Sequence, residues 1–173
     1  MLIKTKFRNA GKVALATLFA LVLLTAPVVA GEATITDRFS FDCTFAEIVE
    51  AVQGHEDEVL LGSFGTTEVV ERKGDKIRVR VNAPGHEESE FTLRMKEDID
   101  FRKKRAEFIS VLVETEGFVT EQETSVISEE KDGKVQVTVR VHVKVPEVGD
   151  KLIRFEVRRC IQKIVRRING LLD

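Results

Sequence analysis

The residues from Lys134 to Val145 alternate between apolar and polar side chains without a break, and this stretch constrains the fold more than any other. Valine occupies every second position, and polar residues stand between the valines. Successive side chains of a β-strand point to opposite faces of the sheet, so this strand has one apolar face and one wet face. A sheet of this kind buries one face, and another element of the chain must cover it.

The sequence after this strand predicts the element that covers the sheet. Pro146 ends the strand, and residues 147–171 have the period of a long amphipathic helix. One arc of this helix is apolar and consists of Ile153, Val157, Cys160, Ile161, Ile164, Val165, Ile168, Leu171 and Leu172. The opposite arc is basic and consists of Lys151, Arg154, Arg158, Arg159, Lys163, Arg166 and Arg167. We expect the apolar arc to lie on the apolar face of the sheet.

The chain upstream of the valine strand predicts six further strands and one or two short helices. Residues 34–43 alternate as a half-buried strand, and Thr44 with Glu47 has the spacing of a capping box for a helix that ends at Gly54. Residues 55–62 predict a second small helix. Further strands are expected at 66–72, 77–81, 91–96, 109–113 and 118–128, between turn signals such as Pro84-Gly85, Gly117 and Lys131-Asp132-Gly133. These turns are of the hairpin kind and favour an antiparallel meander.

The first thirty residues differ from the rest and predict export. Their charged residues are Lys4, Lys6, Arg8 and Lys12, and an uncharged apolar stretch follows them. A basic start, an apolar middle and a small residue at the exit are typical of a secretory signal peptide, here cleaved near Ala30 to leave a periplasmic or secreted domain of residues 31–173. The alternative is an uncleaved membrane anchor, because residues 13–30 approach the length that spans a bilayer.

The net charge of the chain and its lack of catalytic motifs limit the classes of function that we expect. Without the four basic residues of the leader, 23 basic residues face 29 acidic ones, and a net charge of −6 argues against nucleic-acid binding. The sequence has none of the common catalytic or phosphate-binding motifs, and His55, His86 and His142 lack metal-ligand spacing. We therefore expect no catalytic residues, no metal and no cofactor. Cys43 and Cys160 either pair in the exported protein or stay as buried free thiols.

Several motifs and the order of elements resemble a known superfamily. They are Phe39-Ser40-Phe41 before the first helix, Gly117-Phe118 at the sixth strand, the 131–133 turn and Ile168-Asn169-Gly170-Leu171 in the last helix. The chain resembles the START-like, or SRPBCC, helix-grip superfamily, which includes birch pollen allergen homologues, polyketide cyclases and coenzyme Q-binding proteins. The resemblance implies an α+β fold in which a curved seven-stranded antiparallel sheet wraps around the long C-terminal helix.

The resemblance also implies a ligand cavity between sheet and helix. The residues expected to line it are Phe39, Phe41, Phe91, Met95, Phe118, Gln122, Val137, Val139, Val141, Val157, Ile161 and Ile164. The ligand would be a quinone, an isoprenoid or an acyl chain, although plain core packing demands the same residue types. The face of the sixth strand with Thr120, Gln122 and Thr124 is unusually polar, and it lies either beneath the helix or at a partly wet sheet edge.

The function expected from these features is that of an exported, non-enzymatic carrier or binding protein. A cyclase-type enzyme, with Thr120, Gln122 and Thr124 orienting a substrate, is one alternative, and an envelope interaction module with a filled core is another. The basic arc, through Arg158, Arg159, Lys163 and Arg166, would suit an anionic membrane surface. The competing interpretation is a solvated face that complements the acidic sheet.

Overall fold

The structure is a computed structural model that describes residues 31–173 except 62–65, 83–87, 118 and 147. The predicted leader, the Pro84-Gly85 turn and Phe118 lie outside the described residues. The elements follow the predicted order: β1 (Gly31–Phe41), α2 (Phe45–Val52), α3 (Glu56–Leu60), β2 (Thr66–Lys73), β3 (Lys76–Asn82), β4 (Ser89–Asp100), β5 (Arg105–Thr115), β6 (Glu121–Lys131), β7 (Lys134–Val145) and α4 (Asp150–Leu172).

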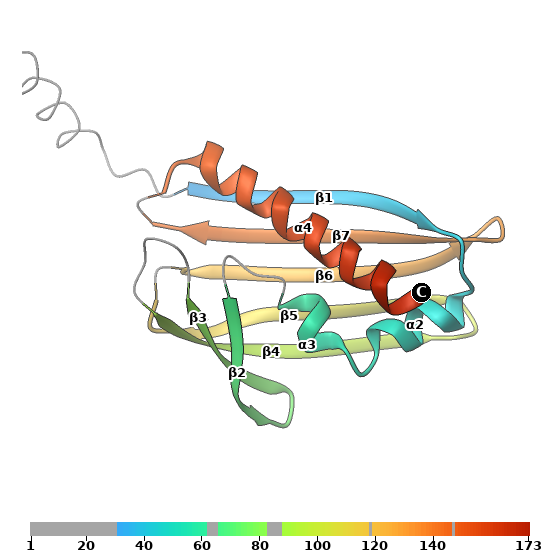
Figure 1. The fold of residues 1–173 in the computed structure, drawn as a ribbon, viewed down its shortest axis with the longest axis horizontal. Helices are drawn as coiled ribbons and strands as arrows, with labels where there is room; N and C mark the ends of the chain where they lie inside the picture. Colours follow the sequence, from blue (N-terminus) through green and yellow to red (C-terminus); the bar gives the residue numbers. More distant parts are fainter. Residues whose placement is uncertain (1–30, 62–65, 83–87, 118, 147) are drawn as a thin grey trace, which may run out of the picture.

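The seven strands form one antiparallel sheet in the order β1-β7-β6-β5-β4-β3-β2. Strands β2 to β7 are a meander, and β1 pairs with β7 at the edge. The sheet curves, and the three helices lie on one side of it, with α4 running diagonally along it (Figure 1). The predicted α+β helix-grip architecture is confirmed.

Local sequence signals explain several boundaries. Helix α2 begins with the predicted capping box, in which the Thr44 hydroxyl accepts from the Glu47 amide at 3.2 Å and the Thr44 amide donates to the Glu47 carboxylate at 2.7 Å. The turn between β6 and β7 needs positive φ at two consecutive residues, Asp132 at 54° and Gly133 at 75°. An Asp-Gly pair meets this demand at low cost.

The register fixes which side chains share the inner, helix-facing side of the sheet. Residues directly opposite one another across a strand pair lie on the same face. One rung of inner-face residues crosses five strands: Met95 of β4, Ser110 of β5, Thr124 of β6, Val141 of β7 and Ile35 of β1. The rungs on either side of it pair Leu93 with Leu112 and Phe108 with Val126.

The core fills the space between the inner face and the helices. Helix α4 packs mainly on β1 and β7, whereas α2 and α3 contact β6, α3 also contacts β5, and both contact α4. All six valines of β7 are buried, as are seven of the nine residues of the apolar arc of α4, whereas Leu171 and Leu172 at its end are half-buried. Burial of each such side chain contributes about 1.5–3 kcal/mol, so the grip of α4 on β1 and β7 is a main source of stability.

Several boundaries differ from the prediction: β1, for example, spans Gly31–Phe41 rather than 34–43, and β5 spans Arg105–Thr115 rather than 109–113. Two of the differences have a local cause. Strand β6 begins at Glu121 rather than 118, because the regular pairing with β7 starts at Glu121 opposite Lys144. Helix α4 begins at Asp150 rather than near 147, because Gly149 is extended, with ψ at 143°. The first residue of β1 lies beside this point, since a side chain at Gly31 would collide with the Val148 carbonyl oxygen and the Ile153 side chain.

Candidate functional site

The predicted ligand-contacting residues come together between the sheet and α4. Phe39, Val137, Val139 and Val141 share the inner face of β1 and β7, and Phe41 pairs there with Val135. Val157, Ile161 and Ile164 are buried on the opposing side of α4. Phe91 and Met95 lie on the inner face of β4, and Gln122 on that of β6. The structure therefore brings all the predicted residues it describes to one side of the sheet.

Packing is tight over part of this set. The exposed fraction of Val137, Val139, Val157, Ile161 and Ile164 is 0%, so no water-sized space borders them. These five residues are core, and a ligand could reach them only if neighbouring side chains moved. Their contact with a ligand stays a prediction.

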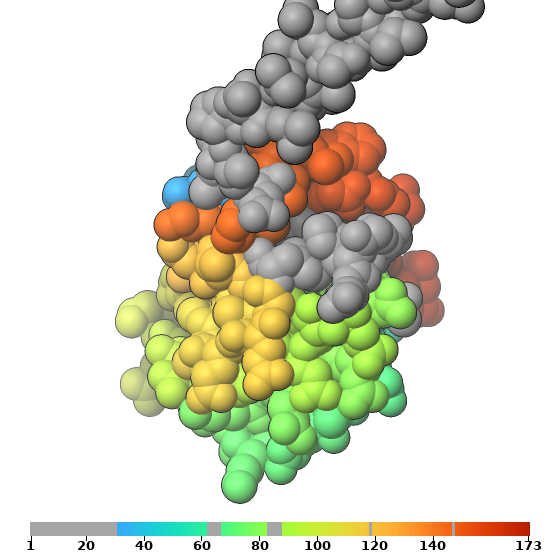
Figure 2. All heavy atoms as spheres, turned by 90° about the vertical axis from the view of Figure 1, so that its left-hand side faces the viewer, coloured from blue at the N-terminus to red at the C-terminus, as the bar shows by residue number. Residues whose placement is uncertain are grey.

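The inner face is less closed toward the end of the sheet where β6 begins and β7 ends. Met95, Leu112 and Gln122 are only half-buried, although all three lie on the inner face of central strands. Figure 2 views this end of the molecule, where the first turns of α4 lie above the start of β6 and the strands β3 and β4. The half-buried inner-face residues Leu112 and Gln122 lie toward this end of the sheet.

Three hydroxyl groups of the described strands are buried on the inner face. Ser110, Thr124 and Ser128 are 0%, 1% and 0% exposed, and their side-chain oxygens have no hydrogen-bond partner among the described residues. The interpretation of β6 as a wet edge is wrong, because β6 lies between β5 and β7. Thr120 does not join this group, since it is exposed and its hydroxyl donates to the Lys144 carbonyl at 3.2 Å.

Sequence reasoning missed Ser110 and Ser128. The alternation of Ile109, Val111 and Val113 drew attention to the wrong face of β5, because Ile109 and Val111 pair with Ser125 and Glu123 on the outer side of the sheet. The inner face of β5 instead consists of Ala106, Phe108, Ser110 and Leu112. Both faces of this strand carry apolar residues, so only pairing with β6 identifies the inner one.

A separate groove lies at the opposite end of α4. It has a volume of about 680 Å³ and lies between the end of β1, α2 and the last turn of α4. Its lining combines the acidic Asp42, Glu47, Glu50 and Asp173 with the apolar Phe41, Ala51, Leu171 and Leu172, so Phe41 of the predicted ligand-contacting set borders this groove. The described residues contain no cluster of three or more potential metal ligands there or elsewhere.

Cys43 and Cys160 do not form a disulfide in the structure. Cys160 is buried in the apolar arc of α4, and burial raises the pKa of its thiol to about 12. Cys43 borders the groove and is half-buried; burial, followed by the carboxylates of Glu47 and Asp42, raises its pKa too. A raised pKa disfavours the thiolate, so neither thiol has the character of a catalytic nucleophile.

Most of the basic arc of α4 faces outward, whereas Lys163 and Arg167 are half-buried and Arg167 donates to the Glu58 carbonyl. Lys151, Arg154, Arg158 and Arg166 are exposed and have no ion pair within the described part of the chain. Two large apolar side chains, Leu152 and Phe155, are each 57% exposed on the same side, and the Arg159 guanidinium lies 5.8 Å from the Phe155 ring centre. Among the described helices, none has the length and apolar character needed to cross a bilayer.

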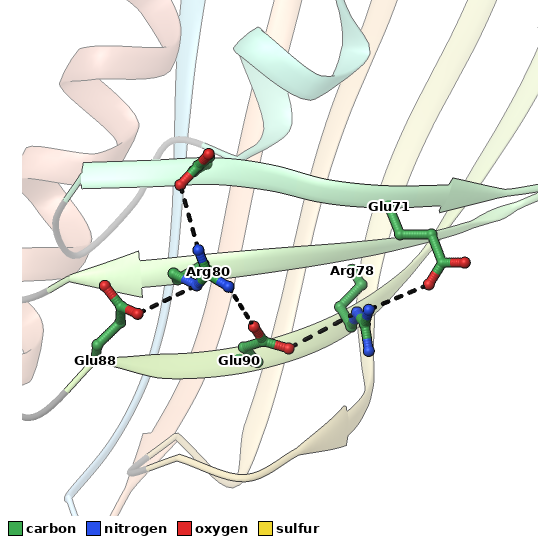
Figure 3. Close-up of polar contacts among 6 residues, drawn as sticks. Glu71, Arg78, Arg80, Glu88 and Glu90 are labelled. Atoms are coloured by element: carbon green, nitrogen blue, oxygen red, sulfur yellow. Dashed lines mark hydrogen bonds and ion pairs between the residues drawn. The ribbon is translucent and has the colours of Figure 1, made fainter.

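Two arginines of β3 pair with glutamates on the outer face of the sheet. Arg80 contacts Glu68, Glu88 and Glu90, and Arg78 bridges Glu71 and Glu90 (Figure 3). The hydrogen bond to Glu90 raises the pKa of Arg80. This network joins β2, β3 and β4 on the side away from the helices, which gives it a structural role.

Comparison with solved structures identifies the fold. The chain is similar to a START superfamily protein from Mycobacterium smegmatis (TM-score 0.58, 12% identity, 80% of this chain and 96% of that one). It is also similar to Ara h 8.0201 (TM-score 0.54, 17% identity, 82% and 98%) and to a norcoclaurine synthase point mutant from Thalictrum flavum (TM-score 0.50, 13% identity, 84% and 96%). No protein-family model and no curated protein sequence matches the chain.

Proposed function

We propose that this chain, which has the START-like, helix-grip fold that the sequence resemblance predicted, is an exported, non-enzymatic binding or carrier protein. Its ligand would be an apolar small molecule, such as a quinone, an isoprenoid or an acyl chain. The observation that supports this most is that Met95, Leu112 and Gln122 are only half-buried although they lie on the inner face of the central strands β4, β5 and β6. Similar folds that bind or act on small molecules agree with it, since the norcoclaurine synthase structure holds a transition-state analogue.

Burial of apolar surface would drive binding. Each Å² of ligand surface removed from water contributes about 25 cal/mol before the costs of immobilisation. Met95 and Leu112 have flexible side chains that can make room beside the closed core. The proposed ligand therefore enters at the end of the sheet where β6 begins and stops against the packed residues around Val139.

Native mass spectrometry of the protein purified from its host tests this proposal. A carrier should release a lipid or other apolar molecule of defined mass when the complex is activated in the gas phase. A purified, ligand-free sample should also bind a fluorescent apolar probe such as 1-anilinonaphthalene-8-sulfonate, and Met95→Trp should weaken that binding by filling the space. A protein that carries nothing and binds no probe would be an interaction module with a filled core.

We propose further that the basic arc of α4 docks on anionic membrane surfaces. Residues 151–167 carry seven basic residues and one acidic residue, a net charge of +6, whereas the remainder of residues 31–173 carries −12. The exposed Leu152 and Phe155 would enter the interface while the surrounding cations contact lipid headgroups. Each basic residue near such a surface contributes about 1 kcal/mol, and salt weakens the attraction.

Sedimentation with vesicles tests the docking surface. The protein should sediment with vesicles that contain phosphatidylserine at low salt, and much less with pure phosphatidylcholine vesicles. Reversal of Arg158, Arg159 and Arg166 to Glu should abolish sedimentation. Reversal of the exposed Lys73, Lys96 and Lys134 of the sheet is the matched control, because it changes the net charge equally. Equal losses in the two variants would show that net charge, rather than the α4 surface, is responsible.

A further inference from the structure

Two of the buried hydroxyls are neighbours at the centre of the inner face. Ser110 of β5 lies directly opposite Thr124 of β6, and Met95 and Val141 flank the pair on the same rung. Both side-chain oxygens are buried without a hydrogen-bond partner among the described residues. A hydroxyl can donate one hydrogen bond and accept others, so the pair presents unused donors and acceptors in apolar surroundings.

The position of this pair matches the boundary between the closed and open parts of the inner face. On one side, Phe108 and Val126 are completely buried. On the other side, Leu112 and Gln122 are half-buried, as is Met95 on the rung itself. Ser128 lies two residues beyond Val126 on the closed side, opposite Ala106, so it is further from the half-buried residues. Ser110 and Thr124 are themselves 0% and 1% exposed, so a ligand reaches them only by displacing the side chains of Met95 and Leu112, and it would then contact this pair before the residues of the closed side.

The charges around the pair limit the chemistry of such a molecule. The inner-face positions of the described strands β4 to β7 contain no Lys, Arg or His. The buried residues of the helices on this side, including Val59, Leu60 and Ile161, are apolar. A carboxylate or phosphate placed here would lose its hydration without gaining a cation, whereas a neutral carbonyl or hydroxyl would need only hydrogen bonds.

We infer that the hydroxyls of Ser110 and Thr124 form the polar subsite that hydrogen-bonds a neutral carbonyl or hydroxyl group of an otherwise apolar ligand. This inference rests on the proposed binding function and adds the chemical class of the ligand's polar group. It selects ketones, quinones, esters and alcohols over free carboxylic acids. Gln122, on the same face of β6 and two residues from Thr124, lies where it can contact the same end of the ligand.

Three naphthalenes of equal skeleton test the subsite: 2-acetylnaphthalene, 2-ethylnaphthalene and 2-naphthoate. At the same ring position, the first carries a neutral carbonyl group, the second carries no polar group and the third carries a carboxylate. Wild-type protein should bind the ketone more tightly than the hydrocarbon, and naphthoate most weakly, with affinities measured by naphthalene fluorescence. The double variant Ser110→Ala/Thr124→Val should lower the affinity for the ketone about fivefold or more and leave that for the hydrocarbon unchanged.

Two further variants control for packing. Ser125→Ala changes a hydroxyl that is 4% exposed on the same strand but on the outer face, and it should leave the preference for the ketone intact. Thr124→Ser, which keeps a hydroxyl in place, should retain most of the preference. If the double variant fails to fold, the comparison of Thr124→Val with Thr124→Ser gives the same test.

The outcomes separate this inference from the proposed function. In one outcome, wild-type protein binds all three compounds, and the double variant has the same ratio of ketone affinity to hydrocarbon affinity as wild type. This result would overturn the subsite and leave the proposed carrier function unaffected. Wild-type protein that binds none of the three would overturn both. Tighter binding of naphthoate than of the ketone would show that a cation reaches the ligand and would also overturn the subsite.

Discussion

The reactivity of the Cys160 thiol tests whether α4 stays packed on the sheet. This residue is 5% exposed in the apolar arc of the helix, and burial raises its pKa from the ordinary 9.0 to about 12, against a smaller opposing effect of Lys163 and Arg167. The Cys43→Ser variant leaves Cys160 as the single thiol of the chain. At pH 8, three pKa units lower the thiolate population of the folded protein about a thousandfold relative to the unfolded chain.

Two measurements follow from this shift. In the Cys43→Ser variant, Ellman's reagent should label Cys160 in native buffer at least about a thousandfold more slowly than in denaturant, because burial also blocks access. The folded state favours the protonated thiol of Cys160. This contribution to stability is therefore fully present below pH 9, the pKa of the unfolded chain, and it is lost as the pH rises from 9 toward 12. The free energy of unfolding from urea titrations should therefore be about 1.4 kcal/mol lower at pH 10 than at pH 8 through this group, and Cys160→Ala should remove that part of the slope.

Native labelling within about tenfold of the rate in denaturant would refute the reasoning. It would mean that α4 leaves the sheet often enough to expose Cys160, and the description of Val157, Ile161 and Ile164 as closed core would then fail as well. Labelling of the Cys160→Ser variant, which keeps Cys43, is the control. The half-buried Cys43 should react faster than Cys160 because it borders the open groove at the end of α4.

Three further predictions concern stability and are measured by chemical denaturation. Ile161→Ala should lower the free energy of unfolding by about 2–5 kcal/mol, because it leaves a cavity beneath α4, whereas Leu152→Ala on the exposed side should change it by less than about 0.5 kcal/mol; similar losses would contradict the grip. Thr44→Ala should cost about 0.5–2 kcal/mol by removing the cap of α2, and a neutral result would mean that the cap bonds do not persist in solution. Gly133→Ala should cost about 1 kcal/mol because φ is 75° there, whereas Gly170→Ala in the exposed last turns of α4 should stabilise by about 0.5–1 kcal/mol; loss at both positions would contradict the assigned conformations.

Much of the fold could be predicted because its signals are local. The valine alternation from Lys134 to Val145, the apolar arc of α4 and the Thr44–Glu47 spacing each appear within a single element, and each has the predicted structure. The Asp132-Gly133 turn likewise depends on two adjacent residues. Local periodicity was sufficient wherever one face of an element is apolar and the other polar.

The candidate site was harder to predict because it depends on register between strands distant in sequence. Ser110 lies between Ile109 and Val111, and nothing in that segment indicates that the serine faces inward. Only the pairing of β5 with β6 places it beside Thr124, which the polar face of the sixth strand had already singled out. The groove at the end of α4 was missed for the same reason, because its lining comes from residues 40–55 and 169–173.

The segregation of charge between α4 and the rest of the domain has a consequence for motion in solution. With +6 on residues 151–167 and −12 on the remainder, the domain is an electric dipole as well as an anion. In the network of β2, β3 and β4, two arginines contact four glutamates, so it remains negative and the helix is the positive pole. The electric field of a negatively charged partner orients such a dipole during diffusion, so α4 is the part of the domain that approaches the partner first.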